Sequence, residues 1–288
     1  MKMPISDVEK VLGRPIFENL CNFFPQNSLN KKVLITGANG SIGTDLIRRL
    51  RELGMDYLST DIEGKHEYMD VTDFQQVLGV VNKYQPDIIV NIAGAKHAPE
   101  GEHETWKTLS INTIGTKNLI DACGPRTKVI LTSTCKSCNP EIVYGASKLI
   151  AERMTLNSGG SVARFFNVVE TSGNVFEIWN NLSENEPLKV ANECGRHFIS
   201  VREATGLIIY CMDSRSGKYI VNSPELRNME SVADALYPER EKIVIPRRRG
   251  DRLNERFKGT AEEPKLLLNQ SVIKLTSNHE KDYLDGEL

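Results

Sequence analysis

The feature that most constrains this chain is a regular alternation of short apolar runs with segments of helical periodicity. The apolar runs predict buried strands at residues 32–36, 57–60, 88–93, 129–133 and 161–166. Helical patterns separate them, beginning at Ser41 and recurring over 74–83, 106–123 and 144–156. Strands that are apolar throughout belong to parallel sheets that helices cover on both faces. The sequence therefore predicts an α/β fold: a Rossmann-type, doubly wound parallel sheet with a smaller C-terminal lobe.

Composition excludes several classes of protein. The 288 residues include 36 basic and 38 acidic side chains, and the formal net charge of −2 argues against broad electrostatic binding of nucleic acid. No apolar run approaches the roughly 18–20 residues that cross a bilayer, and residues 1–10 lack an apolar signal-peptide core. Six scattered cysteines fit free thiols in a reducing compartment. We therefore expect a cytoplasmic protein that binds neither nucleic acid nor membrane.

A glycine-rich turn joins the first predicted strand to the first predicted helix. It reads Thr36-Gly37-Ala38-Asn39-Gly40-Ser41-Ile42-Gly43. Glycine permits the tight turn and lets backbone N–H groups approach a pyrophosphate, whose negative charge the helix N-terminus favours. An acidic residue at the end of the second strand, Asp61, completes the pattern. The context predicts a dinucleotide site rather than a structural turn alone, with cofactor contacts from Gly37, Asn39, Gly40, Ser41, Ile42 and Gly43.

Asp61 also indicates which cofactor binds. An aspartate here accepts hydrogen bonds from the adenosine ribose and repels a 2′-phosphate, and the neutral Thr60 beside it does not offset that charge. We therefore expect NAD, with NADP as the alternative. Other cofactor contacts are expected where strands end: Asp70, Val71, Ala93, Gly94 and Ala95.

A second motif follows the strand at 129–133. Tyr144 and Lys148 are four residues apart and therefore share one face of a helix. The charge of Lys148 can lower the pKa of the tyrosine while its amine holds the nicotinamide ribose. Tyr144 then serves as the base for a sugar hydroxyl as hydride leaves the same carbon. The position of the pair, about 100 residues after the glycine turn, makes the motif specific.

Together these features resemble the extended short-chain dehydrogenase/reductase family. Further segments resemble its UDP-N-acetylglucosamine 4,6-dehydratases, the polysaccharide-biosynthesis group, over roughly residues 10–257: Leu12–Pro15, Ala93–Pro99, Asn112–Asn118, Ser133–Lys136 with Asn139-Pro140, Arg164–Val168 and Arg249–Glu255. The resemblance implies an enzyme that makes a UDP-4-keto-6-deoxy-N-acetylhexosamine for glycan biosynthesis. The lysine-type pair resembles the members that also invert C5.

The resemblance also implies roles for individual residues. Tyr144 and the cofactor oxidise C4, a base removes the C5 proton, the C6 hydroxyl leaves as water, and the stored hydride returns to C6. The family places Asp-Lys after a threonine, whereas this chain reads Thr134-Cys135-Lys136. Lys136 is then the expected C5 base, with its pKa lowered by desolvation. Cys135 is the expected acid, at an ordinary thiol pKa near ~8.5.

Other residues acquire roles only through the resemblance. Asn112 joins the cofactor site, and Lys96, Asn167, Arg196, Arg249 and Glu255 join a site for the UDP-sugar. Arg249 matches an arginine that clamps the diphosphate, for which a guanidinium is geometrically suited. Family members assemble through paired helices, so we expect a homodimer or a higher homo-oligomer.

Cys135 and Cys138 form a CxxC pattern that competes with this interpretation as a redox pair or half of a metal site. Neutral small residues in a loop are the simpler interpretation. The chain has no second CxxC to complete a zinc site, so we expect no metal.

Two other functions remain open from the sequence. A nucleotide-sugar 4-epimerase or 4-reductase would also use Tyr144 and Lys148 but needs no C5 base. A non-catalytic NAD-binding regulatory protein would explain the missing family aspartate. Lys136 favours the dehydratase over the first alternative, and the retained Tyr144 and Lys148 count against the second.

The strand–helix alternation fades after about residue 167, which sets the expected domain boundaries. Residues 31–167, with a returning segment near 191–222, should form the NAD(P)-binding Rossmann domain. Residues 168–190 and 223–257 should form the substrate-binding lobe. Residues 1–30 are expected to be an N-terminal lead-in and 258–288 a polar C-terminal tail.

Overall fold

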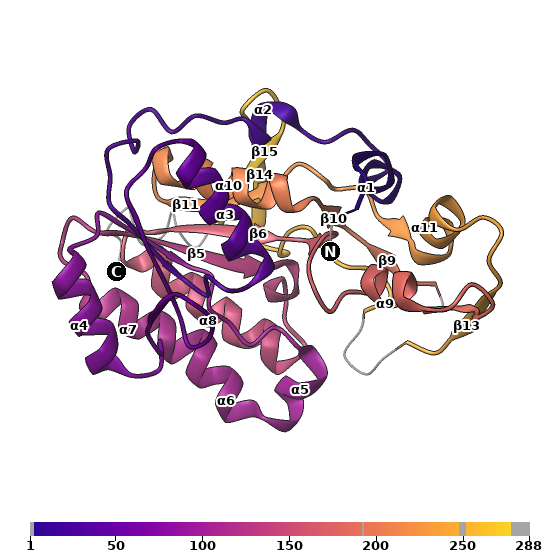
Figure 1. Ribbon diagram of the computed structural model, residues 1–288, viewed down its shortest axis with the longest axis horizontal. Coiled ribbons are helices and arrows are strands. Elements are labelled where there is room, and N and C mark those ends of the chain that lie inside the picture. The colour runs from indigo at the N-terminus through magenta and orange to yellow at the C-terminus, as the bar shows by residue number, and fades with distance from the viewer. Residues whose placement is uncertain (1–2, 192, 248–251, 278–288) are drawn as a thin grey trace.

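The computed structural model describes residues 3–191, 193–247 and 252–277. Its centre is a nine-stranded sheet in the order β14-β15-β11-β6-β5-β4-β1-β2-β3 (Figure 1). The strands are β1 (Val33–Thr36), β2 (Tyr57–Asp61), β3 (Glu67–Tyr68), β4 (Ile88–Asn91), β5 (Lys128–Thr134), β6 (Ser161–Phe165), β11 (Gly217–Val221), β14 (Glu262–Leu267) and β15 (Val272–Ser277). The run from β3 to β11 is parallel. The prediction of a Rossmann-type parallel sheet is confirmed.

Helices cover both faces of this sheet, with α3 and α10 on one side and α4, α7 and α8 on the other (Figure 1). These helices are α3 (Ser41–Glu52), α10 (Val201–Asp213), α4 (Phe74–Tyr84), α7 (Gly115–Ala122) and α8 (Val143–Asn157). Strands β1 and β4 are buried along their whole length, as their unbroken apolar runs predicted. No helix within the described ranges is long and apolar enough to span a membrane.

The helix predicted over 106–123 is interrupted. It consists of α6 (Thr105–Leu109), a π-helical turn at Ser110–Ile114, and α7. Asn112 sits in the wide turn with its side chain fully buried, where its amide bonds to Ala95 and Ser147. A π-turn of this kind often marks a functional position in a helix.

The smaller lobe has its own apolar core, to which the first helix of the described chain contributes. Its elements are α1 (Ile5–Leu12), α9 (Val175–Asn181), α11 (Met229–Leu236) and three short strand pairs: β7 (Asn167–Val168) with β10 (Phe198–Ile199), β9 (Gly195–Arg196) with β12 (Arg227–Asn228), and β8 (Leu188–Ala191) with β13 (Lys242–Ile245). Val8, Val11 and Leu12 of α1 pack in one cluster with Phe176 and Trp179 of α9. The other α-helices among the described residues are α2 (Glu18–Cys21) and α5 (Ala98–His103), and Cys135–Ser137 form a 3-10 helical turn. The lead-in is therefore partly helical: α1 packs in the core of the lobe, whereas Leu20 of α2 packs in the main core.

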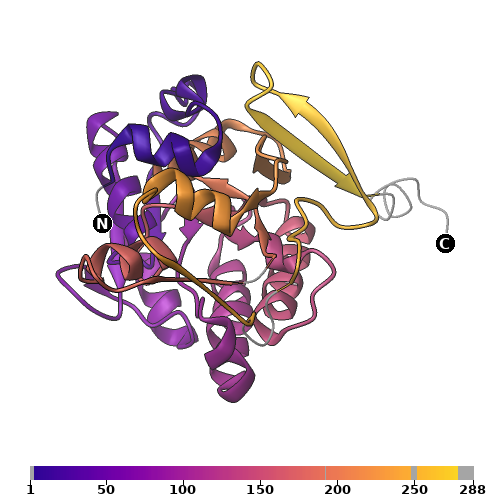
Figure 2. The same cartoon turned by 90° about the vertical axis from the view of Figure 1, so that its right-hand side faces the viewer.

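The expectation of a polar tail from Lys258 was wrong for residues 262–277. Strands β14 and β15 form an antiparallel hairpin, and β15 pairs antiparallel with β11 at the edge of the sheet. Figure 2 shows the hairpin standing out from one side of the molecule. Val272, Ile273 and Leu275 are buried against the main core, which holds β15 in place despite the polar composition around it.

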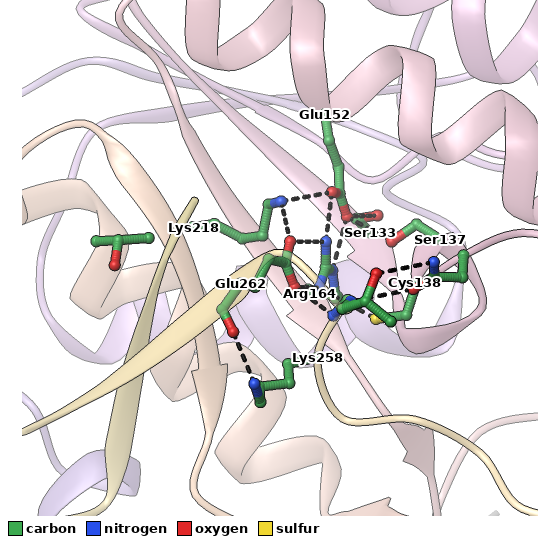
Figure 3. A network of polar contacts seen from close by, with 12 residues as sticks. Ser133, Ser137, Cys138, Glu152, Arg164, Lys218, Lys258 and Glu262 are labelled. Carbon is green, nitrogen blue, oxygen red and sulfur yellow. Dashed lines mark hydrogen bonds and ion pairs between the residues drawn. The ribbon is translucent and has the colours of Figure 1, made fainter. Parts of the chain in front are cut away.

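A buried polar network joins this hairpin to the centre of the sheet (Figure 3). Arg164 of β6 forms bidentate contacts with Glu152 of α8 (2.9 and 2.7 Å) and with Glu262 of β14 (2.6 and 2.8 Å). Lys218 of β11 pairs with both carboxylates, so two cations balance two anions. Burial alone would raise the pKa of Glu152, but the charges of Arg164 and Lys218 hold it below its ordinary value.

Removing one carboxylate from this network should destabilise the protein. Glu262→Ala leaves two buried cations with a single anion, and breaking a buried pair in this way costs about 3–5 kcal/mol in the free energy of unfolding. Glu263→Ala is the matched control: the next residue of the same strand is exposed, so the change should stay within about 0.5 kcal/mol. Urea denaturation of the two variants measures the difference, and equal effects would contradict a stabilising role for the network.

Candidate active site

A cavity of about 870 Å³ runs along the carboxyl ends of the central strands, where ligands bind in open α/β sheets. Residues from both predicted motifs line it, although the motifs are about 100 positions apart in the chain. The predicted site residues that line the cavity are Gly37, Gly40, Ser41, Ile42, Asp61, Asp70, Val71, Ala93, Gly94, Ala95, Lys96, Thr134, Lys136, Tyr144, Lys148 and Asn167.

The glycine turn forms one end of the cavity. Gly37 has φ of 66°, and a Cβ there would lie 2.6 Å from the backbone nitrogen of Ala93, so only glycine fits. Gly43 packs beneath the turn, where a Cβ would meet the Gly37 carbonyl at 2.5 Å. Helix α3 begins at Ser41 without a side-chain cap on its first N–H groups. These groups therefore suit a phosphate.

Two acidic side chains, Asp61 and Asp70, line the cavity near the glycine turn. The backbone N–H of Asn39 donates to Asp61 Oδ2 at 2.9 Å, which fixes the carboxylate at the end of β2. Asn39 itself does not line the cavity. Asp70 Oδ1 already accepts hydrogen bonds from the backbone N–H and the hydroxyl of Thr72, both at 2.8 Å. Asp61 Oδ1 likewise accepts from the Glu63 N–H at 3.2 Å, so local hydrogen bonds fix the orientation of both carboxylates at the cavity.

Tyr144 and Lys148 face the middle of the cavity from α8. Lys148 Nζ donates to the Thr132 carbonyl at 3.2 Å, and burial lowers the pKa of this amine to about 8. Burial raises the pKa of Tyr144, while the charge of Lys136 and a hydrogen bond with Thr134 oppose the rise. The charge of Lys136 therefore acts on the phenol, while the expected effect of Lys148 on Tyr144 stays a prediction.

Asn112 does not line the cavity but fixes its wall. Its Oδ1 accepts from the Ala95 N–H at 2.9 Å, and its Nδ2 donates to the Ala95 carbonyl at 3.1 Å and to Ser147 Oγ at 3.0 Å. One amide thereby ties the segment after β4 to helix α8, next to Lys148.

Lys136 is paired with a carboxylate from the far end of the chain. Its Nζ lies 3.2 Å from Glu255 Oε1, and Glu255 Oε2 accepts from Asn167 Nδ2 at 2.6 Å. Arg196 Nε lies 3.7 Å from Glu255 Oε1 on the other side. Burial alone would lower the pKa of Lys136, but the Glu255 charge raises it above its ordinary value. The expected lowering of this pKa was therefore wrong.

Cys135 does not line the large cavity. Its side chain is buried beside a second cavity of only about 20 Å³, which Lys136 and Glu255 also line. Burial raises the pKa of the thiol to about 12, so the ordinary thiol pKa expected from the sequence was also wrong. Cys138 is buried with its sulfur 3.1 Å from Arg164 Nη1, and no metal-binding cluster occurs among the described residues.

A loop of the smaller lobe closes over the glycine turn, which the sequence did not indicate. The Ser172 N–H donates to Ser41 Oγ at 3.1 Å, and Lys96 Nζ donates to the Ser172 carbonyl at 3.0 Å. Contacts between positions so far apart leave no local sequence signal. The predicted diphosphate ligand Arg249 lies outside the described residues.

Comparison with known proteins places the chain among polysaccharide-biosynthesis proteins. Residues 59–272 match the family model described as "Polysaccharide biosynthesis protein". The Staphylococcus aureus capsular polysaccharide biosynthesis protein CapD is 30% identical over 70% of this chain and 39% of CapD. The inverting UDP-N-acetylglucosamine 4,6-dehydratase of Campylobacter jejuni is 27% identical over 78% of this chain and 76% of that enzyme. The chain spans about two fifths of the length of CapD.

Solved structures share the fold. Pen from Bacillus thuringiensis matches with a TM-score of 0.73 at 21% identity, covering 86% of this chain and 89% of Pen. A Thermus thermophilus UDP-glucose 4-epimerase, solved in complex with NAD, gives a TM-score of 0.68 at 19% identity, covering 78% of this chain and 89% of the epimerase. The match to the family model over residues 59–272 covers well over half of the chain. The chain therefore belongs to the polysaccharide biosynthesis protein family.

Proposed function

We propose that this chain is an NAD-dependent UDP-N-acetylglucosamine 4,6-dehydratase that also inverts C5. The observation that carries the proposal is the single cavity that brings Tyr144, Lys148 and Lys136 next to the glycine turn. The similarity to the inverting Campylobacter enzyme over most of both chains supports the same reaction. Assembly as a homodimer or larger oligomer remains a prediction.

The site residues suit a nicotinamide cofactor. The first backbone N–H groups of α3 have no side-chain cap and can bind a pyrophosphate. The tight turn at Gly37, which packs against Ala93, holds these groups in place. Asp61 would hold the adenosine ribose, and Lys148 the nicotinamide ribose. The cofactor supplies a place to store the C4 hydride until C6 receives it.

The remaining steps fall to side chains around the sugar. Tyr144 accepts the proton of the C4 hydroxyl, and the neighbouring charge of Lys136 favours its phenolate form. Oxidation at C4 acidifies the C5 proton, which Lys136 removes so that the C6 hydroxyl can leave. Lys96 and Asn167, which line the same cavity, are placed to orient the UDP-sugar.

A nucleotide-sugar 4-epimerase is the second candidate. It is favoured by the replacement of the family carboxylate with Cys135, whose thiol lies outside the large cavity and titrates far above neutral pH. An epimerase would use Tyr144 and Lys148 alone.

Cofactor preference tests the role of Asp61. The wild type should bind NAD(H) at least about tenfold more tightly than NADP(H), because a carboxylate repels the 2′-phosphate and a charged hydrogen bond contributes about 1.5–3 kcal/mol. Asp61→Asn should reduce this preference, whereas Glu63→Gln, a nearby exposed carboxylate, should retain it. Calorimetric titration measures both, and tighter binding of NADP by the wild type would refute the ribose assignment.

Tyr144→Phe should abolish turnover while cofactor binding survives. The phenol is needed for the C4 proton, whereas the ring alone fills its place on α8. Product analysis and cofactor titration on the same preparation provide the two readouts. Near-normal product formation by the variant would refute the catalytic placement.

Lys136→Ala should separate the dehydratase from the epimerase. If Lys136 removes the C5 proton, the variant cannot eliminate water. Oxidation of C4 should be slower but not lost, because the Tyr144 phenol keeps its place without the neighbouring charge, so reduced nicotinamide should accumulate on the enzyme. Absorbance of the bound nicotinamide follows this directly. A variant that instead inverts C4 at the wild-type rate, without loss of water, would favour the epimerase.

A further inference from the structure

Lys136 lies between two cavities and contacts a carboxylate that can exchange a proton with it. Its side chain lines both the large cavity and the small one behind it, and is 27% exposed. Nζ is 3.2 Å from Glu255 Oε1. No other carboxylate among the described residues forms an ion pair or hydrogen bond with this amine.

Glu255 is held firmly behind Lys136. Its side chain is 6% exposed, its Oε2 accepts from Asn167 Nδ2, and its backbone N–H donates to the Gly195 carbonyl at 3.2 Å. Arg196 lies on the far side of the carboxylate. Burial raises the pKa of Glu255, but the charges of Lys136 and Arg196 outweigh it and hold the pKa below its ordinary value. The resting pair is therefore an ammonium and a carboxylate.

A charged Lys136 cannot act as a base until it loses a proton. Cys135 cannot take that proton in place of the family aspartate, because its thiol remains protonated up to a pKa of about 12. Burial of both charges becomes more costly when a sugar fills the large cavity and excludes the water that still reaches Lys136. That cost favours transfer of the proton within the pair.

We propose that Glu255 accepts the ammonium proton of Lys136 and so converts this lysine into the base of the elimination, an inference that rests on the dehydratase function proposed above. Because Glu255 acts through Lys136, it is a positioning residue.

The elimination returns Lys136 and Glu255 to their starting protonation states. The ammonium proton moves to Glu255 Oε1, leaving an amine and a carboxylic acid. The amine takes the C5 proton of the 4-keto sugar, the C5–H electrons form the C5–C6 double bond, and the C6–O bond breaks. The departing hydroxide takes a proton from the ammonium just formed and leaves as water. The proton on Glu255 then returns to Lys136 and restores the pair.

Two variants of Glu255 and one control test the proposal. Glu255→Gln keeps the size and a hydrogen-bond acceptor but cannot take a proton. Loss of the carboxylate charge lets burial lower the pKa of Lys136, but the proton must then leave to water that the bound sugar excludes, so elimination should still slow by about 10²–10⁴-fold, the range for lost acid–base catalysis. Reduced nicotinamide should accumulate on this variant. Glu141→Gln is the control, because Glu141 borders the same small cavity but is 68% exposed and pairs with Arg252 rather than Lys136. It should remain within threefold of the wild type, roughly the effect of an ordinary surface change.

Chemical rescue separates proton transfer from a structural role. Glu255→Ala enlarges the small cavity next to Lys136, so added formate can enter and accept the proton. Formate should raise the elimination rate of Glu255→Ala at least about tenfold and leave Glu255→Gln unchanged, because the glutamine still fills the space. Cofactor titration checks that each variant is folded.

Each result decides the question. Dehydration by Glu255→Gln at nearly the wild-type rate would overturn the inference while leaving the proposed function intact. So would a slow, folded Glu255→Ala that does not respond to formate. If Glu255→Ala does not fold, the rate of Glu255→Gln decides alone. A wild type that forms no dehydrated product would overturn the proposed function and this inference together.

Discussion

The part of the cavity lined by Tyr144, Lys148 and Lys136 depends on Glu152, a completely buried carboxylate of helix α8. Tyr144, Lys148 and Glu152 follow one another at intervals of four and therefore lie on one face of α8. Glu152 Oε1 accepts from Ser133 Oγ at 2.6 Å and from Ser137 Oγ at 2.7 Å. These two serines bracket the segment that carries Thr134 and Lys136. One carboxylate thus sets the distance between the helix and the loop.

A buried carboxylate needs compensating charge. This requirement links the cavity to the β14–β15 hairpin, which is the last part of the described chain. Arg164 and Lys218 supply two positive charges, which in turn need the second carboxylate of Glu262 on β14. The β14–β15 hairpin therefore helps to support the loop that carries Lys136, through the polar network drawn in Figure 3. On the other side, Glu255 ties Lys136 to Asn167 and Arg196. The loop is therefore fixed by two sets of contacts: Glu152 bonds to its two serines, and Glu255 pairs with Lys136.

The sequence predicted the features that depend on local patterns. Unbroken apolar runs indicated the parallel strands, and the glycine turn required a close backbone approach that Gly37 makes to Ala93. Tyr144 and Lys148 could be found because helical spacing brings them together. The structure places these local motifs around one cavity, while their individual roles remain predictions.

The features that the sequence did not reveal depend on contacts between distant residues. Lys136 and Glu255 are 119 positions apart, so neither the ion pair nor its effect on the pKa of Lys136 has a local signal. The hairpin was mistaken for a tail because charged residues are interspersed with the apolar ones in its strands. Only the pairing of β15 with β11 shows that the hairpin belongs to the sheet. Cys135 looked available from its place after Thr134, yet the turn of the chain directs its side chain toward the small cavity.

The most direct test of the account is the product that the purified wild-type protein forms from UDP-N-acetylglucosamine in heavy water with NAD. A dehydratase that removes the C5 proton must yield a sugar that has lost one water and carries solvent deuterium at C5. Mass spectrometry and NMR of the product measure both properties at once. A product of unchanged mass with an altered C4 centre would contradict the account and identify an epimerase.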